Sequence, residues 1–209
     1  MTCRGRILLA VVSDGIGGLE EGEKASGYIA EMLAENFYRH VVPVMGRGKG
    51  KNAIRRNFLR CFYEINAALK AYGRERDLKL GATVSLVFVW KRNYGIFHLG
   101  DSRIYLFRRG KIRMLTRDHS DGGRGLTKCL GSFPFQSPDI QFGRLGRRSG
   151  FLLCTDGFYR MLEPMELEIL LPEEIELEEQ IEKRLRELAR AALKKGEADN
   201  MSAVYLRLG

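Results

Sequence analysis

The feature that most constrains the fold is a series of four short β-rich segments between residues 82 and 115. Apolar and β-branched residues fill 82–90, 94–99, 103–108 and 111–115, and only a few polar residues separate each segment from the next. Asn93 lies in the first connection and Gly110 in the third, as is typical of hairpin turns. Because such connections are too short for crossover helices, the pattern predicts a meander of antiparallel strands.

Two helical stretches precede these strands. Apolar residues recur at helical spacing through 20–40 and again through 52–71, and Gly73 is expected to end the second helix. Each stretch has one apolar face, which needs a surface such as a sheet to cover. Pro43 and the glycine–lysine run at 46–51 predict a flexible basic loop between the helices, since the run lacks the pattern of a phosphate-binding loop.

The remaining elements are one strand at the start of the chain and a mixed C-terminal part. The apolar run 7–12 predicts a short buried strand that ends in a glycine-rich turn at 15–18. Residues 116–149 read as irregular, with a helical turn at 127–130 and an extended piece at 140–144. The pattern after them predicts a strand at 151–155, helical segments at 157–162, 164–171 and 173–195, and a last strand at 202–208. We therefore expect an α+β fold with two packed antiparallel β-sheets flanked by helices, an α-β-β-α sandwich formed by one domain over 1–209.

Composition excludes several classes of protein. No apolar run is long enough to cross a bilayer, and the first residues show no secretory pattern. The four cysteines have no CxxC spacing, which predicts reduced thiols and neither a disulfide framework nor a zinc site. We expect a cytoplasmic protein without a membrane partner. The net charge of +9 is spread along the chain and accompanies no nucleic-acid-binding motif, so we expect no nucleic-acid partner either.

An aspartate stands beside each of four predicted strands. Asp14 follows the strand at 7–12, Asp101 follows 96–99, and Asp156 follows 151–154. Asp199 lies just before the last strand. If these strand ends share one edge, the four carboxylates converge and repel each other unless cations lie among them. Oxygen ligands alone favour Mg²⁺ or Mn²⁺, and two such ions can share a hydroxide.

Four sequence blocks carry the aspartates and their neighbours. The first block is Ser13-Asp14-Gly15-Ile16-Gly17-Gly18 with residues 22–26, and the second runs from Gly81-Ala82-Thr83 through Gly100-Asp101-Ser102-Arg103 to residues 115–120. The third is Leu152-Leu153-Cys154-Thr155-Asp156-Gly157, and the fourth is Asp199-Asn200-Met201-Ser202. Together and in this order they resemble the bacterial type 2C, metal-dependent serine/threonine protein phosphatases. The resemblance covers the chain from about residue 7 to 208.

The resemblance implies a metal centre formed by the aspartates. Asp14 would bridge two core ions, Mn²⁺ or Mg²⁺, and the carbonyl of Gly15 would serve the second ion. Asp156 and Asp199 would hold the first ion, and Asp101 would help to hold a third, weaker ion. Asp14, Asp156 and Asp199 would thereby be the catalytic residues, positioning a water for attack on phosphoserine or phosphothreonine without a covalent enzyme intermediate.

The family pattern also assigns supporting roles. Asn200 would orient the Asp199 loop as a neighbour of the ligands, and His119 and Arg103 would be structural. The implied partner is a phosphorylated protein, the substrate of a serine/threonine kinase, and we expect a monomer.

Two departures from the family pattern leave an alternative open. The family's first strand, with its phosphate-binding arginine, has no counterpart here, and Arg4 and Arg6 stand in a different context, so the phosphate-binding residue is unknown. The stretch 120–126 is shorter than the usual flap, and Leu19 replaces a common histidine. The chain could therefore be a catalytically weak or inactive regulatory module that binds phosphoproteins.

Overall fold

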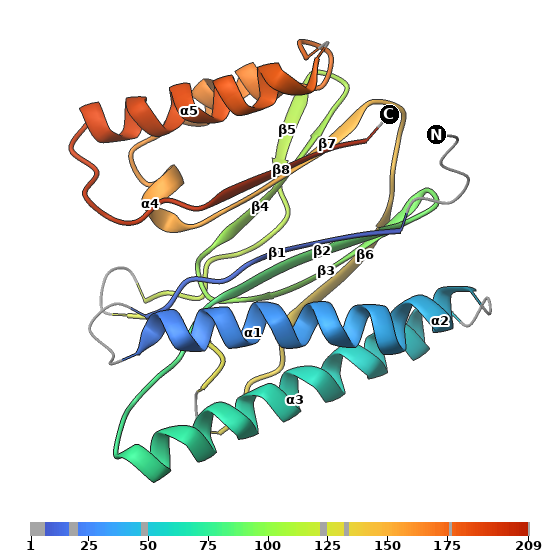
Figure 1. Cartoon of the computed structure of the whole chain (residues 1–209). Helices are drawn as coiled ribbons and strands as arrows, with labels where there is room; N and C mark the ends of the chain where they lie inside the picture. The colour runs from blue at the N-terminus through green and yellow to red at the C-terminus, as the bar shows by residue number, and fades with distance from the viewer. Residues whose placement is uncertain are drawn as a thin grey trace. The chain divides into compact units, whose positions relative to one another are not determined.

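The computed structural model describes residues 7–16, 21–46, 50–121, 125–131, 134–175 and 177–208. The chain divides into two compact units, one formed by 1–100 and 119–144 and the other by 101–118 and 145–209. Each unit contains one antiparallel four-stranded sheet with helices (Figure 1). The expected α+β class with two antiparallel sheets flanked by helices is confirmed. No helix within the described ranges has the length and apolarity to span a membrane.

The sheet of the first unit has the strand order β1-β2-β3-β6. Its strands are β1 (Ile7–Val12), β2 (Val84–Trp90), β3 (Asn93–Leu99) and β6 (Asp139–Arg144). Val12 pairs with Ser85 and Val84 with Leu99, so the chain beyond β1, the start of β2 and the end of β3 meet at one end of the sheet. This register places the turn after Val12 beside residues 81–83.

Helices of the first unit cover one face of its sheet (Figure 1). They are α1 (Gly22–Asn36), the π-helix η1 (Phe37–Val41), α2 (Val42–Gly46) and α3 (Lys51–Arg76). Fully buried side chains of α1 and α3 pack on Phe88 and Phe97 of the central strands, and the rings of Phe58 and Phe97 lie 4.6 Å apart. Burial of such large aromatic side chains holds the helices to the sheet.

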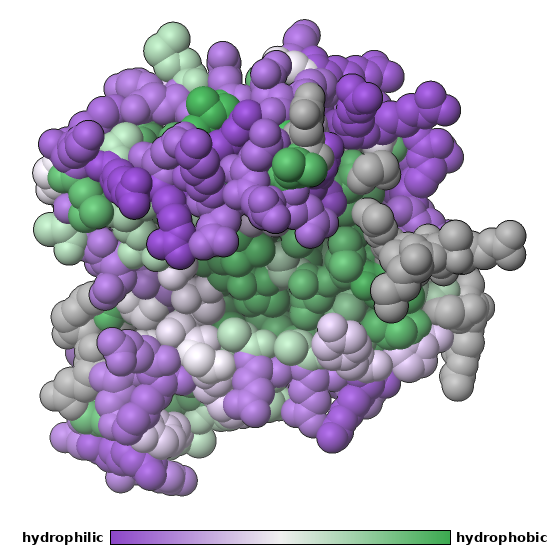
Figure 2. Space-filling model, turned by 45° about the horizontal axis from the view of Figure 1, so that its top comes forward, coloured by the Kyte–Doolittle hydropathy of each residue, from purple (hydrophilic) through white to green (hydrophobic). Residues whose placement is uncertain are grey.

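The sheet of the second unit has the order β5-β4-β7-β8. Its strands are β4 (Arg103–Arg108), β5 (Lys111–Met114), β7 (Ser149–Cys154) and β8 (Ala203–Leu208), and its helices are α4 (Asp156–Tyr159), the 3₁₀ helix η2 (Pro164–Leu170) and α5 (Glu178–Lys194). Arg103 pairs with Cys154 and Cys154 with Ala203. The start of β4, the end of β7 and the start of β8 therefore share one end of the sheet. Figure 2, in which the side of α5 is turned forward, shows many hydrophilic residues on that side.

The meander is the main correction to the predicted topology. The hairpin β2–β3 belongs to the first sheet and the hairpin β4–β5 to the second, so the chain changes sheets between Leu99 and Arg103. The strands β2, β3 and β4 all carry mainly buried apolar residues, and such a run identifies a buried strand without identifying its sheet.

Several element boundaries also differ from the prediction. Pro43 lies inside α2 and not in a loop, because the wider π turn of η1 ends just before it. Gly73 lies inside α3, where its carbonyl accepts the Leu78 amide at 2.8 Å, and a Cβ atom there would meet the Leu78 carbonyl oxygen. Residues 127–130 form bends and a β-bridge in place of the predicted helical turn. Helix α5 begins at Glu178, later than predicted.

Some sequence predictions concern residues outside the described ranges. These are Arg4, Arg6, the turn glycines Gly17 and Gly18, Leu19, and parts of the basic loop at 46–51 and of the stretch 120–126. Cys3 is another, and the three cysteines in the described ranges, Cys61, Cys129 and Cys154, form no disulfide with one another. Burial raises the pKa of Cys61 to about 12 and also raises that of Cys154, so both stay protonated at neutral pH.

Candidate active site

Asp14 lies in a turn that is fixed to the start of β2. Its amide donates to Thr83 Oγ1 at 3.0 Å, its carbonyl accepts the Thr83 amide at 2.8 Å, and Ser13 Oγ donates to the Thr83 carbonyl at 2.7 Å. A Cβ atom on Gly15 would collide with the Gly22 backbone, so only glycine allows this approach of α1. The first two sequence blocks thus meet within the first unit, and Asp14 is half-buried there.

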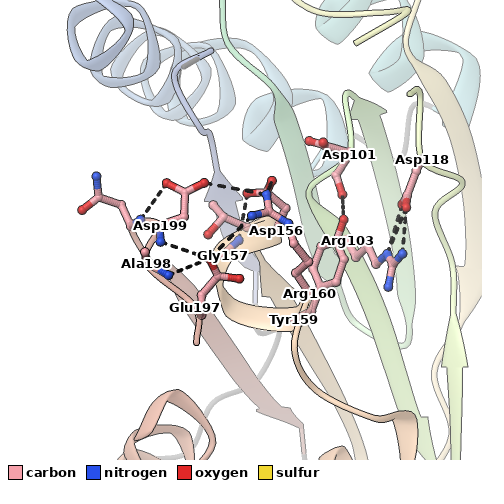
Figure 3. A network of polar contacts seen from close by, with 12 residues as sticks. Asp101, Arg103, Asp118, Asp156, Gly157, Tyr159, Arg160, Glu197, Ala198 and Asp199 are labelled. Carbon is pink, nitrogen blue, oxygen red and sulfur yellow. Dashed lines mark hydrogen bonds and ion pairs between the residues drawn. The ribbon is translucent and has the colours of Figure 1, made fainter. Parts of the chain in front are cut away.

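Asp156 and Asp199 lie together at one end of the second sheet. Asp156 begins α4 directly after β7, and Asp199 lies in the loop before β8. The guanidinium of Arg160 pairs with Asp156 Oδ2, and its Nη2 lies 3.7 Å from Asp199 Oδ2. Figure 3 shows both carboxylates turned toward Arg160. Two carboxylates that repel each other are thus held beside one cation.

Glu197 adds a third carboxylate to this group. Its Oε1 accepts the amides of Ala198 and Asp199, both at 3.0 Å, and lies 3.5 Å from Arg160 Nη1. The Glu197 side chain is only 3% exposed, and its buried Oε2 has no hydrogen-bond partner among the described residues. The Asp199 loop therefore turns around a buried carboxylate.

Asp101 is linked to the same region through Tyr159. The Tyr159 hydroxyl donates to the Asp101 carbonyl at 2.9 Å, and the ring of Tyr159 lies 3.7 Å from the Arg103 guanidinium carbon (Figure 3). Burial raises the pKa of the Asp101 carboxyl, and the charge of Asp156 raises it further. For Arg160, burial alone would lower the pKa, but the charges of Asp156, Glu197 and Asp199 outweigh it and raise the pKa.

The structure brings Asp101, Asp156 and Asp199 to one end of the second sheet, as the sequence predicts. The convergence of Asp14 with them stays a prediction, because Asp14 belongs to the first unit. Asn200 contributes its main-chain amide, which donates to Asp199 Oδ1 at 2.8 Å. Its predicted role in orienting the loop also stays a prediction.

His119 supports the end of β3 in the first unit. The Gly100 amide donates to its Nδ1 at 3.1 Å, so a neutral ring carries its proton on Nε2, which lies 3.1 Å from Asp139 Oδ2. The ring also stacks on His98 at 4.8 Å. These contacts agree with the structural role expected for His119.

Sequence reasoning missed Arg160 and Glu197. Arg160 follows Asp156 by one helical turn, and this i,i+4 spacing could have predicted their ion pair. Glu197 follows a glycine in a polar turn, where a glutamate is ordinarily exposed, so no sequence signal predicted its burial.

The donor set fits a hard divalent cation. The acidic side chains offer only oxygen atoms, and they already attract the guanidinium of Arg160. Within the described part of the chain, Glu197 Oε2 has no hydrogen-bond partner. With the side chains as they lie, no group of three or more His, Cys, Asp or Glu residues in the described ranges could hold a metal ion. The carboxylates would have to rearrange around an ion.

Comparisons with known proteins find relatives that are named phosphatases. The chain is 25% identical to the serine/threonine phosphatase stp of Listeria welshimeri over 202 residues, which cover 82% of this chain and 74% of that protein. It is 28% identical to the serine/threonine protein phosphatase PstP of Mycobacterium tuberculosis, covering 94% of this chain but only 39% of PstP.

Solved structures share the fold. A bacterial serine phosphatase superposes with a TM-score of 0.82 at 24% identity, covering 98% of this chain and 90% of that one. The PstP catalytic domain, solved in complex with two manganese ions, superposes with a TM-score of 0.75 at 24% identity, covering 96% of this chain and 89% of that one. Residues 2–204 match the family model described as Protein phosphatase 2C, and the chain therefore belongs to the protein phosphatase 2C family.

Proposed function

We propose that this protein is a metal-dependent phosphatase that hydrolyses phosphoserine and phosphothreonine in proteins. The observation that carries the proposal is the pair of carboxylates of Asp156 and Asp199, which the guanidinium of Arg160 holds together at one end of the second sheet. The chain that carries this pair belongs to the phosphatase family named above. The relatives named serine/threonine phosphatases support the substrate class.

The proposed site uses the aspartates in different ways. Asp14 would bridge two Mn²⁺ or Mg²⁺ ions with help from the Gly15 carbonyl, Asp156 and Asp199 would hold one of them, and Asp101 would help to hold a third. The manganese ions of the PstP complex support this choice of metal. Bound ions of this kind supply a water that is acidic enough to act as hydroxide near neutral pH.

The chain's own residues would prepare the site for that water. The hydrogen bonds of Thr83 hold the backbone at Asp14, and the amide of Gly157 donates to Asp156 Oδ1 at 2.8 Å, which fixes the rotation of that carboxylate. Asn200 would orient Asp199. We further propose that residues 1–209 act as one phosphatase domain and as a monomer in the cytoplasm, on proteins phosphorylated by a serine/threonine kinase.

One observation favours a second candidate function. Because Arg160 already pairs with Asp156 and Asp199, the site could remain metal-free and serve a regulatory module that binds phosphoproteins without hydrolysing them. The two candidates predict different dependence on metal.

The deciding experiment is turnover of p-nitrophenyl phosphate and of a phosphothreonine peptide, with Mn²⁺, with Mg²⁺ and with a chelator. Asp156→Asn removes a ligand charge, and Asp77→Asn is its matched control, because Asp77 is an exposed cap of α3 in a left-handed conformation that asparagine also adopts. Turnover that requires metal, persists in the control and falls at least about 100-fold in Asp156→Asn supports the phosphatase. Absence of turnover, with phosphopeptide binding retained, would support the regulatory module.

A further inference from the structure

Among the residues that the structure describes, Arg160 is the one that contacts all three carboxylates of the second unit's site. Its guanidinium pairs with Asp156, and it approaches Glu197 Oε1 to 3.5 Å and Asp199 Oδ2 to 3.7 Å (Figure 3). The side chain is 47% exposed, so it can move without unfolding its surroundings. An arginine stays charged at every physiological pH. It therefore supplies a permanent positive charge to these carboxylates.

The carboxylate of Glu197 offers Arg160 a further partner besides the two aspartates. Its side chain is almost wholly buried, and its Oε1 is satisfied by two main-chain amides and approached by Arg160. Its Oε2 is buried without a hydrogen-bond donor from the residues that the structure describes. A buried carboxylate oxygen without a donor reduces the stability of the fold, so Glu197 Oε2 is an acceptor that a donor group can still bind.

We propose that Arg160 is an internal counter-ion, which holds Asp156 and Asp199 in the metal-free protein and moves onto Glu197 when a divalent cation takes those aspartates. The inference rests on the proposed function in one respect, namely that Asp156 and Asp199 bind such a cation. Arg160 Nη1 already lies 3.5 Å from Glu197 Oε1, and the move that we propose is a change of side-chain rotamer that brings a donor to Oε2.

The arrangement couples metal binding to the position of Arg160. Arg160 and the cation compete for the same two carboxylates, so the cation must displace the guanidinium and binds more weakly than it would without it. Glu197 reduces this penalty, since it offers the displaced guanidinium a second anionic partner. The same ion pairs stabilise the metal-free protein by limiting repulsion between the aspartates.

The test measures Mn²⁺ affinity by titration, with the electron paramagnetic resonance signal of free Mn²⁺ as the readout, beside the melting temperature of the metal-free protein. Arg160→Met should bind Mn²⁺ about tenfold more tightly and melt at a lower temperature without metal. The Mn²⁺ affinity and the melting temperature of Arg160→Lys should lie between those of Arg160→Met and those of the wild type. Arg186→Met is the matched control, since it removes an arginine that pairs with Glu182 on α5, and it should leave the affinity unchanged.

Glu197→Gln sharpens the test, because glutamine keeps an acceptor for the two amides but removes the negative charge. It should weaken Mn²⁺ binding several-fold in the wild-type background and have no effect in the Arg160→Met background. Equal affinity in the wild type and Arg160→Met overturns the inference, and so does an equal effect of Glu197→Gln in both backgrounds. Absence of Mn²⁺ binding in every variant overturns the proposed function itself and the inference with it.

Discussion

Arg103, at the start of β4, forms a bidentate ion pair with Asp118. Arg103 Nε lies 3.1 Å from Asp118 Oδ1, and Arg103 Nη2 lies 2.8 Å from Oδ2. The same guanidinium stacks on Tyr159, whose hydroxyl binds the Asp101 carbonyl. Arg103 therefore links the segment before His119, through Tyr159, to the backbone of Asp101, which is a predicted metal ligand. These contacts agree with the structural role expected for Arg103.

Arg103→Lys should destabilise the metal-free protein by about 1–3 kcal/mol, because a lysine cannot make the paired contact and also stack flat on the ring. The measurement is the free energy of unfolding in urea. Arg113→Met is the control, since Arg113 is exposed on the neighbouring strand β5 and should change the stability by less than about 0.5 kcal/mol. Equal losses in the two variants would contradict the role of Arg103.

Tyr159→Phe should cost about 1 kcal/mol of stability, the usual value of one hydrogen bond, and should also reduce metal-dependent turnover, because the Asp101 backbone loses its support. Tyr205→Phe is a closely matched control. The Tyr205 hydroxyl also donates to a carbonyl, that of Leu170 at 2.5 Å, but at the contact between β8 and η2. It should lose similar stability and keep full turnover relative to the amount of folded protein. Parallel loss of turnover in both variants would show that Tyr159 acts only through stability.

Gly157→Ala should destabilise the protein by about 1–3 kcal/mol and displace the Asp199 loop. A Cβ atom at Gly157 would lie 2.5 Å from the Asn200 carbonyl oxygen and 3.1 Å from Asp199 Cβ, and neither is the end of a flexible side chain. Gly27→Ala in α1 meets nothing within 4 Å and should be neutral or stabilising by up to about 1 kcal/mol. Thermal unfolding and Mn²⁺ titration of both variants check the prediction, and a Gly157→Ala protein with wild-type stability and affinity would contradict it.

The aspartates of the site could be predicted from the sequence because each stands where an apolar strand meets a turn. The strand assignments needed only the alternation and length of apolar runs, and those signals are local. The division of the hairpins between two sheets was not predictable in this way, because it depends on which neighbours each strand finds. The prediction of a loop at Pro43 was wrong because a proline is a clear sequence signal for the end of a helix. The π turn of η1, which lets the helical chain continue past Pro43, has no comparable sequence signal.

Arg160 and Glu197 show what the family pattern leaves out. The sequence blocks that carry the family resemblance include neither residue, so the resemblance alone could not point to them. The contact between Arg160 and Asp156 follows from helical spacing, but its approach to Glu197 and Asp199 needs the loop before β8 to return to α4. That return is a long-range contact, and local patterns carry no information on it.

The ion pair of Asp139 with Lys128 and its contact with His119 predict a pH dependence of the stability in the first unit. Partial burial raises the pKa of Asp139, but hydrogen bonds from Lys128 and His119 outweigh it and leave the pKa below its ordinary value of 3.8. Since the folded protein holds this proton less tightly than the unfolded chain, the pairs stabilise the fold above pH 3.8 and lose their effect as the pH falls through the lowered pKa.

Asp139→Asn should therefore reduce the free energy of unfolding by about 0.5–1 kcal/mol at pH 7, a small value because the side chain is half-exposed and screened by solvent. The difference from the wild type should shrink as the pH falls below 3.8. Urea unfolding of both proteins between pH 7 and pH 3 measures it, with Asp77→Asn as the control that should show no such trend. A difference that stays constant with pH would mean that Asp139 stabilises the protein by packing and not by its charge.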